Sequence, residues 1–362
     1  MTKTKPHISV VPPAQHGAFD YAELARLGMS PDEIIDFSVN SNPYGPPPGI
    51  REIVEQTPLE RYPDRECIAL RAKLAEVHGI GIDQIVVGNG TAELLQLIAF
   101  AFLERGARVI IPETTFGEYE RAARLMGAEV SRLRWDPDAA HLLFDLEAKF
   151  IHLGESMATS NMVFLCNPNN PDGSYILPDW IANDWARRNP DTLFVVDEAY
   201  AQFLMEPQTN ISANVPNVIV VRSMTKDYAL AGLRLGYAVG HPDVIEALRR
   251  VRPAWNVNAL AQAAGTAALD QSDWLRTTVV QLHRDKTYLV NGLRALDLKP
   301  LPSNVHFFLV NVSDGAAFRS KLLHHQIMVR DCASFGLPEY VRIATRTPQD
   351  NARLLDAARL CL

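Results

Sequence analysis

The sequence is poor in cysteine, in positive charge and in long apolar segments, and each shortage disfavours a class of protein. Its four cysteines are scattered without metal-like spacing or the density of a disulfide-stapled domain, which is typical of a reducing compartment. The net charge of −7 disfavours a nucleic-acid-binding protein, which is usually basic. The longest apolar segment, 94–103, contains Gln96 and is too short to span a bilayer, and the first residues show no apolar signal segment. We therefore expect a cytoplasmic protein that binds neither nucleic acid nor membrane.

Internal repeats and low-complexity tracts are also missing. Between about residues 50 and 250, short apolar segments alternate with amphipathic helical patterns, which predicts an α/β domain with a mainly parallel sheet. The expected strands are 84–87, 108–111, 162–166, 193–196, 218–221 and 234–239. After Pro253 a long helical pattern leads into a shorter α+β block. We predict an N-terminal arm, residues 1–45, a large domain, 46–255, and a small C-terminal domain, 256–362.

One lysine stands out because of the residues around it. Lys226 follows the apolar segment 218–221 among small and apolar residues, and Arg234 lies a little further along the chain. Partial burial and a neighbouring cation both lower the pKa of an amine and free it to act as a nucleophile. An isolated lysine after a strand is more often an ordinary surface residue, so only the residues around Lys226 favour a role as nucleophile.

Those surroundings resemble the lysine-bearing segment of fold-type-I enzymes that depend on pyridoxal 5'-phosphate (PLP). The pattern is Ser223-Met-Thr-Lys226 followed by Gly232-Leu-Arg234-Leu-Gly236. The resemblance implies a mainly parallel seven-stranded sheet with one antiparallel strand, and a smaller α+β domain. It also implies that Lys226 binds PLP covalently and acts in catalysis, while Ser223 and Arg234 hold the cofactor phosphate.

A glycine-rich turn, Gly88-Asn-Gly-Thr-Ala-Glu93, joins an expected strand to an expected helix. Glycines allow the tight turn, and the N-terminus of the helix offers free N–H groups to an anion. Taken alone, such a turn is a weak signal. The resemblance assigns Gly90, Thr91 and Ala92 to the PLP phosphate.

Four further residues match the ring-binding part of the family's site. Asp197 directly follows the apolar segment 193–196, at the strand end where α/β sheets bind ligands. It matches the catalytic carboxylate that keeps the pyridine nitrogen protonated, so that the ring withdraws electrons. Asn170 and Tyr200 match residues that contact the phenolic oxygen, and Phe116 matches an aromatic that stacks on the ring. Singly, each residue is equally typical of a cap, a turn or a core.

The segment Arg61-Tyr62-Pro63-Asp64 resembles one that reaches into the neighbouring subunit's site. There the residue matching Tyr62 touches the PLP phosphate, which implies a homodimer with shared active sites. Without the resemblance, the segment would pass as an ordinary Pro-Asp turn.

Two subfamilies share these motifs, the histidinol-phosphate aminotransferases and the threonine-phosphate decarboxylases of cobalamin biosynthesis. His16-Gly-Ala with the segment 36–42, Asp-Phe-Ser-Val-Asn-Ser-Asn, and the block Val329-Arg-Asp-Cys-Ala-Ser-Phe335 resemble the decarboxylases more closely. We therefore expect decarboxylation of L-threonine O-3-phosphate to (R)-1-amino-2-propanol O-2-phosphate. The alternative is a histidinol-phosphate aminotransferase, or a related class I/II aminotransferase, that uses 2-oxoglutarate and glutamate.

Several cationic and polar residues near the two ends of the chain are predicted to bind this small phosphorylated substrate: His16, Asn42, Arg330, Arg342 and Arg346. Arg342 matches the arginine that binds the substrate's carboxylate, a task suited to its planar, bidentate side chain. The phosphate is assigned to His16, Arg330 and Arg346. Positions that depart from the family patterns lie mainly on the substrate side: Ala18, Asp172 and His306.

Overall fold

The computed structural model of the chain describes residues 4–11, 17–133, 159–213 and 215–362. Its largest sheet has seven strands in the order β2-β8-β7-β6-β5-β3-β4. β8 runs antiparallel to both of its neighbours, and the other neighbouring strands are parallel. The strands are β2 (Ile85–Gly88), β3 (Arg108–Pro112), β4 (Glu129–Leu133), β5 (Met162–Cys166), β6 (Leu193–Asp197), β7 (Val218–Ser223) and β8 (Gly236–Val239). This confirms the predicted α/β fold with one reversed strand.

The central strands are buried along their whole length, which explains their continuous apolar sequences. Every residue of β5 and of β7 is buried. α4 (Thr91–Phe102) packs against β2, β7 and β8, and α5 (Glu118–Leu125) packs against β3 and β4. The sequence did not predict β4. It is an edge strand with the sequence Glu-Val-Ser-Arg-Leu, whose exposed polar side chains leave no continuous apolar pattern.

The remaining α-helices of the described residues lie in the N-terminal arm, flank the large sheet or belong to the C-terminal part. They are α1 (Tyr21–Leu27), α2 (Ile50–Gln56), α3 (Ile68–His78), α8 (Pro242–Val251), α9 (Ala259–Ala268), α10 (Ser272–Arg294), α11 (Gly315–His324) and α12 (Pro348–Cys361). Several start at a side chain that accepts hydrogen bonds from the first turn, as helix-capping residues do. Asp20 caps α1, Asn258 caps α9 and Thr347 caps α12.

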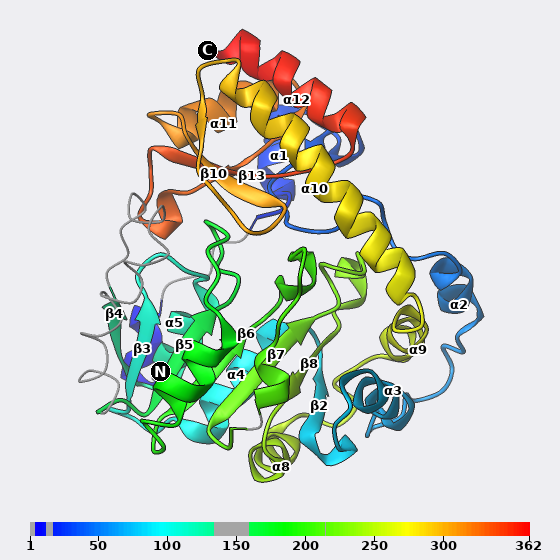
Figure 1. Cartoon of the computed structure of the whole chain (residues 1–362), viewed down its shortest axis with the longest axis vertical. Helices are drawn as coiled ribbons and strands as arrows, with labels where there is room; N and C mark the ends of the chain where they lie inside the picture. The colour runs from blue at the N-terminus through cyan, green and yellow to red at the C-terminus, as the bar shows by residue number, and fades with distance from the viewer. Residues whose placement is uncertain (1–3, 12–16, 134–158, 214) are drawn as a thin grey trace.

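A second sheet, antiparallel and in the order β12-β13-β10-β9, forms the C-terminal part in the upper half of Figure 1. Its strands are β9 (Lys299–Pro300), β10 (Phe307–Asn311), β12 (Arg330–Asp331) and β13 (Tyr340–Ala344). β1 (Ile35–Asp36) in the N-terminal arm pairs in parallel with β11 (Ile327–Met328). The arm is therefore attached to the C-terminal part, although the large sheet lies between them in the sequence.

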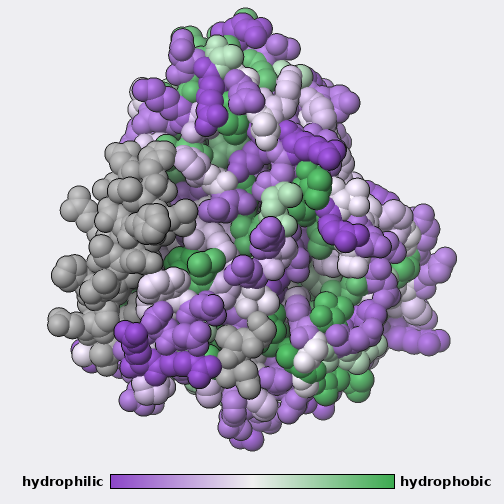
Figure 2. All heavy atoms as spheres, viewed as in Figure 1, coloured by the Kyte–Doolittle hydropathy of each residue, from purple (hydrophilic) through white to green (hydrophobic). Residues whose placement is uncertain are grey.

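α10 runs from the neighbourhood of α9 up to the C-terminal part (Figure 1). Separate clusters of buried side chains support the two sheets, one around Phe164 and Val195, the other around Phe308 and Leu354. On the face shown in Figure 2 hydrophilic side chains predominate, and the apolar strands lie beneath them. In the described ranges, none of the helices combines the length and hydrophobicity that crossing a bilayer requires. The two boundaries between the three predicted domains stay predictions.

Candidate active site

A cavity of about 360 Å³ lies at the carboxyl ends of the central strands, and its walls also include the arm and the C-terminal sheet. Parallel strands end at the same edge of a sheet, so residues distant in sequence meet there. Much of the predicted site lines this cavity: Thr91, Ala92, Phe116, Asn170, Asp197, Tyr200, Ser223, Lys226, Arg234, Arg330 and Arg342. Gly90 is not itself a lining residue, but it precedes Thr91 and lies close to the guanidinium of Arg234.

Asp197 is held as a buried carboxylate at the end of β6. Its Oδ2 accepts a hydrogen bond from Tyr119 Oη at 2.8 Å, and its Oδ1 accepts one from the Ala199 N–H at 3.0 Å. Burial raises the pKa of Asp197 to about 6, and the hydrogen bond from Tyr119 opposes that rise. At neutral pH the group is therefore ionised and can hold a protonated ring nitrogen.

Lys226 lies just beyond β7, on the wall of the cavity. Its backbone carbonyl accepts a hydrogen bond of 2.8 Å from the Asn42 N–H, which ties the arm to the lysine segment. Burial lowers the pKa of the Lys226 amine to about 8, and the positive charges of Arg342 and Arg234 act in the same direction. These are the two influences expected from the sequence. An amine with this pKa offers an appreciable unprotonated fraction near neutral pH.

The turn before α4 forms a cradle with the shape that an anion requires. Gly90 has φ +79°, and a Cβ at this position would lie 2.8 Å from Arg234 Nη2. A Cβ at Gly236 would lie 2.9 Å from the backbone nitrogen of Thr91. The start of α4 therefore lies close to Arg234 and to the backbone of Gly236, and Ser223 lines the same cavity. Arg234 is exposed, so this side of the cavity is open to solvent.

The opposite end of the cavity carries a second cation. Arg342 is buried on β13; its Nη1 donates to Asn170 Oδ1, and its Nη2 donates to the Ser38 carbonyl at 2.5 Å. Its guanidinium lies 5.7 Å from the centre of the Phe307 ring. Arg342 Nε has no hydrogen-bond partner among the described residues. A buried guanidinium with a spare donor is suited to an anionic group of a ligand.

Some predicted residues do not reach this cavity. The side-chain amide of Asn42 donates to the Asp227 carbonyl and to Thr278 Oγ1, so its donor atoms are used inside the fold. Arg346 pairs with Asp350 at 2.9 Å and does not line the cavity. Neither residue is among those that line the cavity, and their roles in substrate binding stay predictions. Two more predicted residues are elsewhere: Tyr62 is 82% exposed, and His16 lies outside the described residues.

Other residues of the site were missed in the sequence. Asn40 lines the cavity while being only 2% exposed, and neither atom of its amide has a hydrogen-bond partner in the described part of the chain. It stands in the same Asp-Phe-Ser-Val-Asn-Ser-Asn segment as Asn42, so the motif pointed to a loop that lines the cavity, and the asparagine on the wall is Asn40. Tyr119 has no motif of its own, because a buried tyrosine on a helix resembles any core aromatic.

The three positions that depart from the family patterns lie at different depths. Ala18 lines the cavity. Asp172 is buried outside its wall; it accepts a 2.8 Å hydrogen bond from Asn169 Nδ2, and burial raises its pKa to about 6. His306 is fully buried with its ring centre 4.0 Å from that of Phe203, and burial lowers its pKa well below the usual value. Neither Asp172 nor His306 contributes to the cavity wall.

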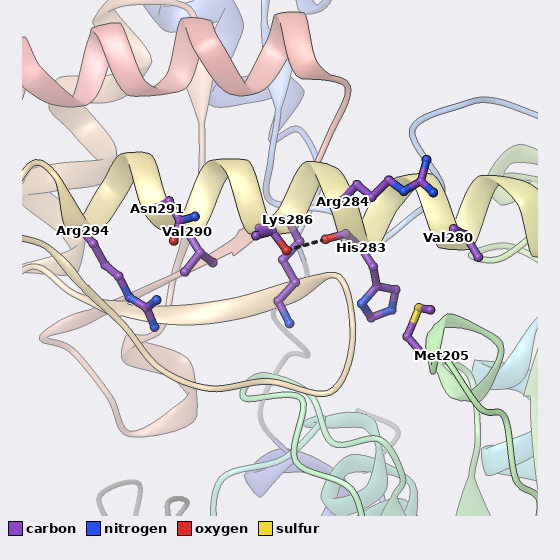
Figure 3. A pocket seen from close by; sticks show the side chains of 9 residues that line it. Met205, Val280, His283, Arg284, Lys286, Val290, Asn291 and Arg294 are labelled. Carbon is purple, nitrogen blue, oxygen red and sulfur yellow. Dashed lines mark hydrogen bonds between the residues drawn. The ribbon is translucent and has the colours of Figure 1, made fainter.

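A larger hollow, of about 600 Å³, runs along α10 (Figure 3). Arg294, Lys286 and His283 point into it from one side of the helix, and Met205 faces them from the loop after β6. Lys286 Nζ donates to the carbonyls of Ser303 and Val305, and no predicted cofactor residue lines the hollow. The chemistry therefore belongs to the smaller cavity around Lys226.

PLP carries a phosphate and a ring nitrogen, and the smaller cavity sets an anion cradle and a buried carboxylate against these two groups. The Cβ-free cradle at Gly90 and Gly236, the ionised Asp197 and the aromatic Phe116 all fit the cofactor. The fold and the cavity thus define a PLP-dependent enzyme of fold type I. Within that class the chain belongs to the aminotransferase class I and II family, whose match spans residues 32–357.

Individual relatives bear on the choice between the aminotransferase and the decarboxylase subfamily. The chain is 35% identical, over 97% of its length and 91% of the relative's, to histidinol-phosphate aminotransferase 1 of Thiobacillus denitrificans. It is similar to the structure of histidinol-phosphate aminotransferase from Sinorhizobium meliloti in complex with pyridoxal-5'-phosphate, with a TM-score of 0.87, 25% identity and coverage of 100% and 98% of the two chains. The structure of L-threonine-O-3-phosphate decarboxylase from Porphyromonas gingivalis gives a TM-score of 0.78 at 28% identity and covers 90% and 98%.

These findings correct the predicted decarboxylase activity. Curated relatives at 32–36% identity, aligned over 92–98% of this chain, carry the name histidinol-phosphate aminotransferase. The motifs that favoured the decarboxylase, around His16 and Arg330, were predicted to bind a phosphorylated substrate. Histidinol phosphate and L-threonine O-3-phosphate are both phosphorylated, so such motifs do not separate the two reactions.

The cradle yields a first prediction, the variant Gly90→Ala. We expect its dissociation constant for PLP to rise by at least about tenfold, or about 1.4 kcal/mol, because the added methyl group displaces the Arg234 guanidinium. Titration of the apoenzyme with PLP measures this. Gly49→Ala is a control for substitution at a positive φ, since Gly49 has φ +81° and ψ −10° and a Cβ added there would meet no atom within 4 Å. Gly90 has ψ 168°, which at this φ is essentially restricted to glycine, so backbone strain adds to the contact with Arg234. Equal losses in both variants would contradict the prediction that the cradle at Gly90 is responsible.

Proposed function

We propose that this chain is a histidinol-phosphate aminotransferase, which moves the amino group of L-histidinol phosphate to 2-oxoglutarate and yields glutamate. The observation that carries the proposal is the set of relatives of that name, which align with nearly the whole chain at 32–36% identity. The site supports it with one cradle for the cofactor phosphate and a separate cationic end at Arg342 and Arg330 for the anionic group of the substrate.

The chain's own residues divide the work of binding. The start of α4, Ser223 and Arg234 hold the cofactor phosphate, and Asp197 holds the proton on the ring nitrogen. Arg342 and Arg330 orient the substrate by its phosphate, and in the second half of the cycle they bind a carboxylate of 2-oxoglutarate. Both anions suit planar guanidinium groups, so one cationic end serves both substrates in turn.

The proton transfers are assigned to Lys226. When bound, PLP supplies the aldehyde that takes up the amino group and the ring that withdraws electrons from the substrate Cα. The Lys226 amine, whose pKa burial lowers to about 8, is basic enough to accept the Cα proton and acidic enough to return it. Asp197 stays ionised at neutral pH and keeps the ring nitrogen protonated throughout.

The proposal includes a second copy of the chain. The phosphate side of the cavity is open in the single chain, because Arg234 is exposed there. Tyr62 is also exposed, and its ring lies 4.8 Å from that of Trp255, which is exposed too. Two exposed aromatic rings and an open phosphate site suit an arrangement in which Tyr62 of one copy covers the cradle of the other.

Mixed dimers test this arrangement. A Lys226→Ala subunit supplies Tyr62 but no catalytic lysine, and a Tyr62→Phe subunit supplies the lysine but no tyrosine hydroxyl. Their heterodimer contains one site with neither lesion, so we expect activity above the average of the parents. Heterodimers purified through two different tags provide the measurement. Activity that never exceeds the parental average would contradict a shared site.

The proposed reaction is tested with the holoenzyme in one assay format. L-Histidinol phosphate and 2-oxoglutarate should yield glutamate, and omission of either should stop its formation. Aspartate and aromatic amino acids, offered at the same concentration, serve as competing donors. Glutamate formed from one of these but not from histidinol phosphate would keep the family assignment and overturn the substrate.

A further inference from the structure

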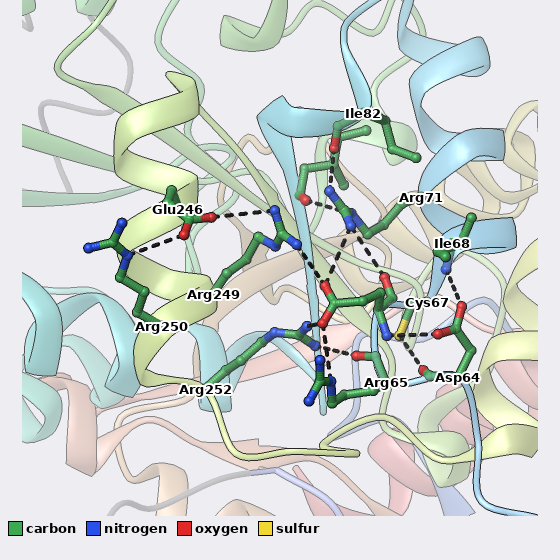
Figure 4. Close-up of polar contacts among 12 residues, drawn as sticks. Asp64, Arg65, Cys67, Ile68, Arg71, Ile82, Glu246, Arg249, Arg250 and Arg252 are labelled. Carbon is green, nitrogen blue, oxygen red and sulfur yellow. Dashed lines mark hydrogen bonds and ion pairs between the residues drawn. The ribbon is translucent and has the colours of Figure 1, made fainter.

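Several arginines converge on one carboxylate in front of α3, outside the cavity (Figure 4). Glu66 Oε2 pairs with Arg249 Nη2 at 2.8 Å, and its Oε1 pairs with Arg252 Nη2 at 2.8 Å. Arg65 and Arg71 approach the same carboxylate at 3.4 and 3.9 Å. The hydrogen bond from Arg249 is the main reason that the pKa of Glu66 is lowered.

This cluster joins two separate parts of the chain. Glu66 belongs to the segment that contains Tyr62, whereas Arg249 and Arg252 belong to the end of α8 and the residue after it. Arg252 also donates to the Arg65 carbonyl at 2.7 Å. The Arg252 side chain is only 7% exposed, so water competes little for its contacts.

The same arginine leads on to the turn that forms the cradle. Arg252 Nη1 donates to Asn256 Oδ1 at 3.4 Å, and Asn256 Nδ2 donates to Glu93 Oε2 at 2.7 Å. That oxygen also accepts a hydrogen bond of 2.6 Å from the Asn89 N–H, in the turn before α4. The connector 252–256 is thus fastened to the rigid base of its own chain's phosphate site.

Trp255 stands on this connector with φ +54°, a left-handed conformation that is rare for a bulky residue. Trp255 is 48% exposed, and its ring packs against the ring of Tyr62, which is exposed too. Bonds on both sides therefore hold the ring pair: the connector holds Trp255, and Glu66 holds the segment of Tyr62. Without these contacts, an exposed tyrosine on a loop would sample many orientations.

We propose that Glu66 and Arg252 are positioning residues, which fix the Tyr62–Trp255 ring pair in the orientation that it presents to the cofactor site of a second copy. The inference rests on the proposed shared site. Neither residue contacts the reacting atoms; both act through Tyr62. Loss of the Glu66 carboxylate should therefore damage the site of the other subunit and not the site of the chain that carries the change.

The test uses the mixed dimer of Lys226→Ala and Tyr62→Phe subunits. Glu66→Gln is added either to the Lys226→Ala subunit, which donates Tyr62 to the intact site, or to the Tyr62→Phe subunit, which supplies the lysine of that site. In the first placement we expect PLP to dissociate from the intact site about tenfold faster. In the second placement the rate should not change. Glu246→Gln in the donating subunit is the control, because it removes pairs with Arg249 and Arg250 on α8 and leaves Glu66 unchanged.

The outcomes distinguish a failure of the positioning role of Glu66 and Arg252 from a failure of the shared site. A mixed dimer without the Glu66 change that is no more active than the average of its parents would overturn the shared site and the inference with it. An active mixed dimer in which both placements of Glu66→Gln behave alike would overturn the inference alone. A general loss of folding lowers the melting temperature in both placements and does not reproduce the expected asymmetry.

Discussion

Replacement of Lys226 by alanine is expected to lower kcat by at least about 10⁴-fold, since positioned proton transfer alone contributes roughly 10²–10⁴-fold. The variant also loses the amine that attaches the cofactor. No other described amine lines the cavity, so none can take over its role. Steady-state amino transfer by the PLP-reconstituted variant measures the loss.

The matched control is Lys286→Met. Among the described lysines, Lys286 is the other one whose pKa burial lowers to about 8, but its amine donates to the carbonyls of Ser303 and Val305 beside α10. This variant should retain most of its activity at a temperature where it is folded. Borohydride reduction of the wild-type holoenzyme should label the Lys226 peptide; a label at Lys286, or a protein that PLP cannot turn yellow, would contradict the assignment.

The second large effect is expected from Asp197→Asn, which keeps the shape of the side chain and removes its charge. We expect kcat to fall by about 10²–10³-fold, the usual cost of losing one buried electrostatic group in an active site. Asp172→Asn is the control, because Asp172 is also a buried carboxylate whose pKa is raised to about 6, yet it does not line the cavity. Comparable losses in both variants would indicate a structural cause.

The raised pKa of Asp197 gives the same residue a pH signature. Below about pH 6 the carboxylate takes up a proton and can no longer balance a positive ring nitrogen. The affinity of the apoenzyme for PLP should therefore fall as the pH drops through about 6. In Asp197→Asn the affinity should be weak throughout and should not change over that range. If the variant kept the wild-type fall in PLP affinity near pH 6, Asp197 would be excluded as the responsible group.

The sequence predicted the parts of the fold that are encoded locally. Continuous apolar segments marked the buried strands, whereas β4 escaped because an edge strand with exposed Glu and Arg side chains carries no such pattern. The site residues that stand in motifs at strand ends, such as Asp197 and Lys226, do line the cavity. Tyr119, whose hydroxyl bonds to Asp197 from 78 positions away, could not be found because this contact exists only in the folded chain.

The prediction of a threonine-phosphate decarboxylase was wrong for a chemical reason. Arginines near the C-terminus and a polar arm fit any small phosphorylated amine, and the same residues suit an aminotransferase and a decarboxylase. Which bond at Cα breaks depends on how the substrate is oriented in the cavity. The side chains that line the cavity, such as Asn40 and Arg342, have neighbours from distant parts of the sequence, so the sequence alone does not give the arrangement that would orient a substrate.

The central claim is that this enzyme moves the amino group of histidinol phosphate. Its most direct test follows that nitrogen: holoenzyme is incubated with L-histidinol phosphate labelled with ¹⁵N at the amino group and with unlabelled 2-oxoglutarate, and glutamate is analysed by mass spectrometry. The account predicts that ¹⁵N-glutamate forms over many turnovers and that the Lys226→Ala protein forms none. Fully loaded wild-type enzyme that leaves the label in histidinol phosphate would contradict it.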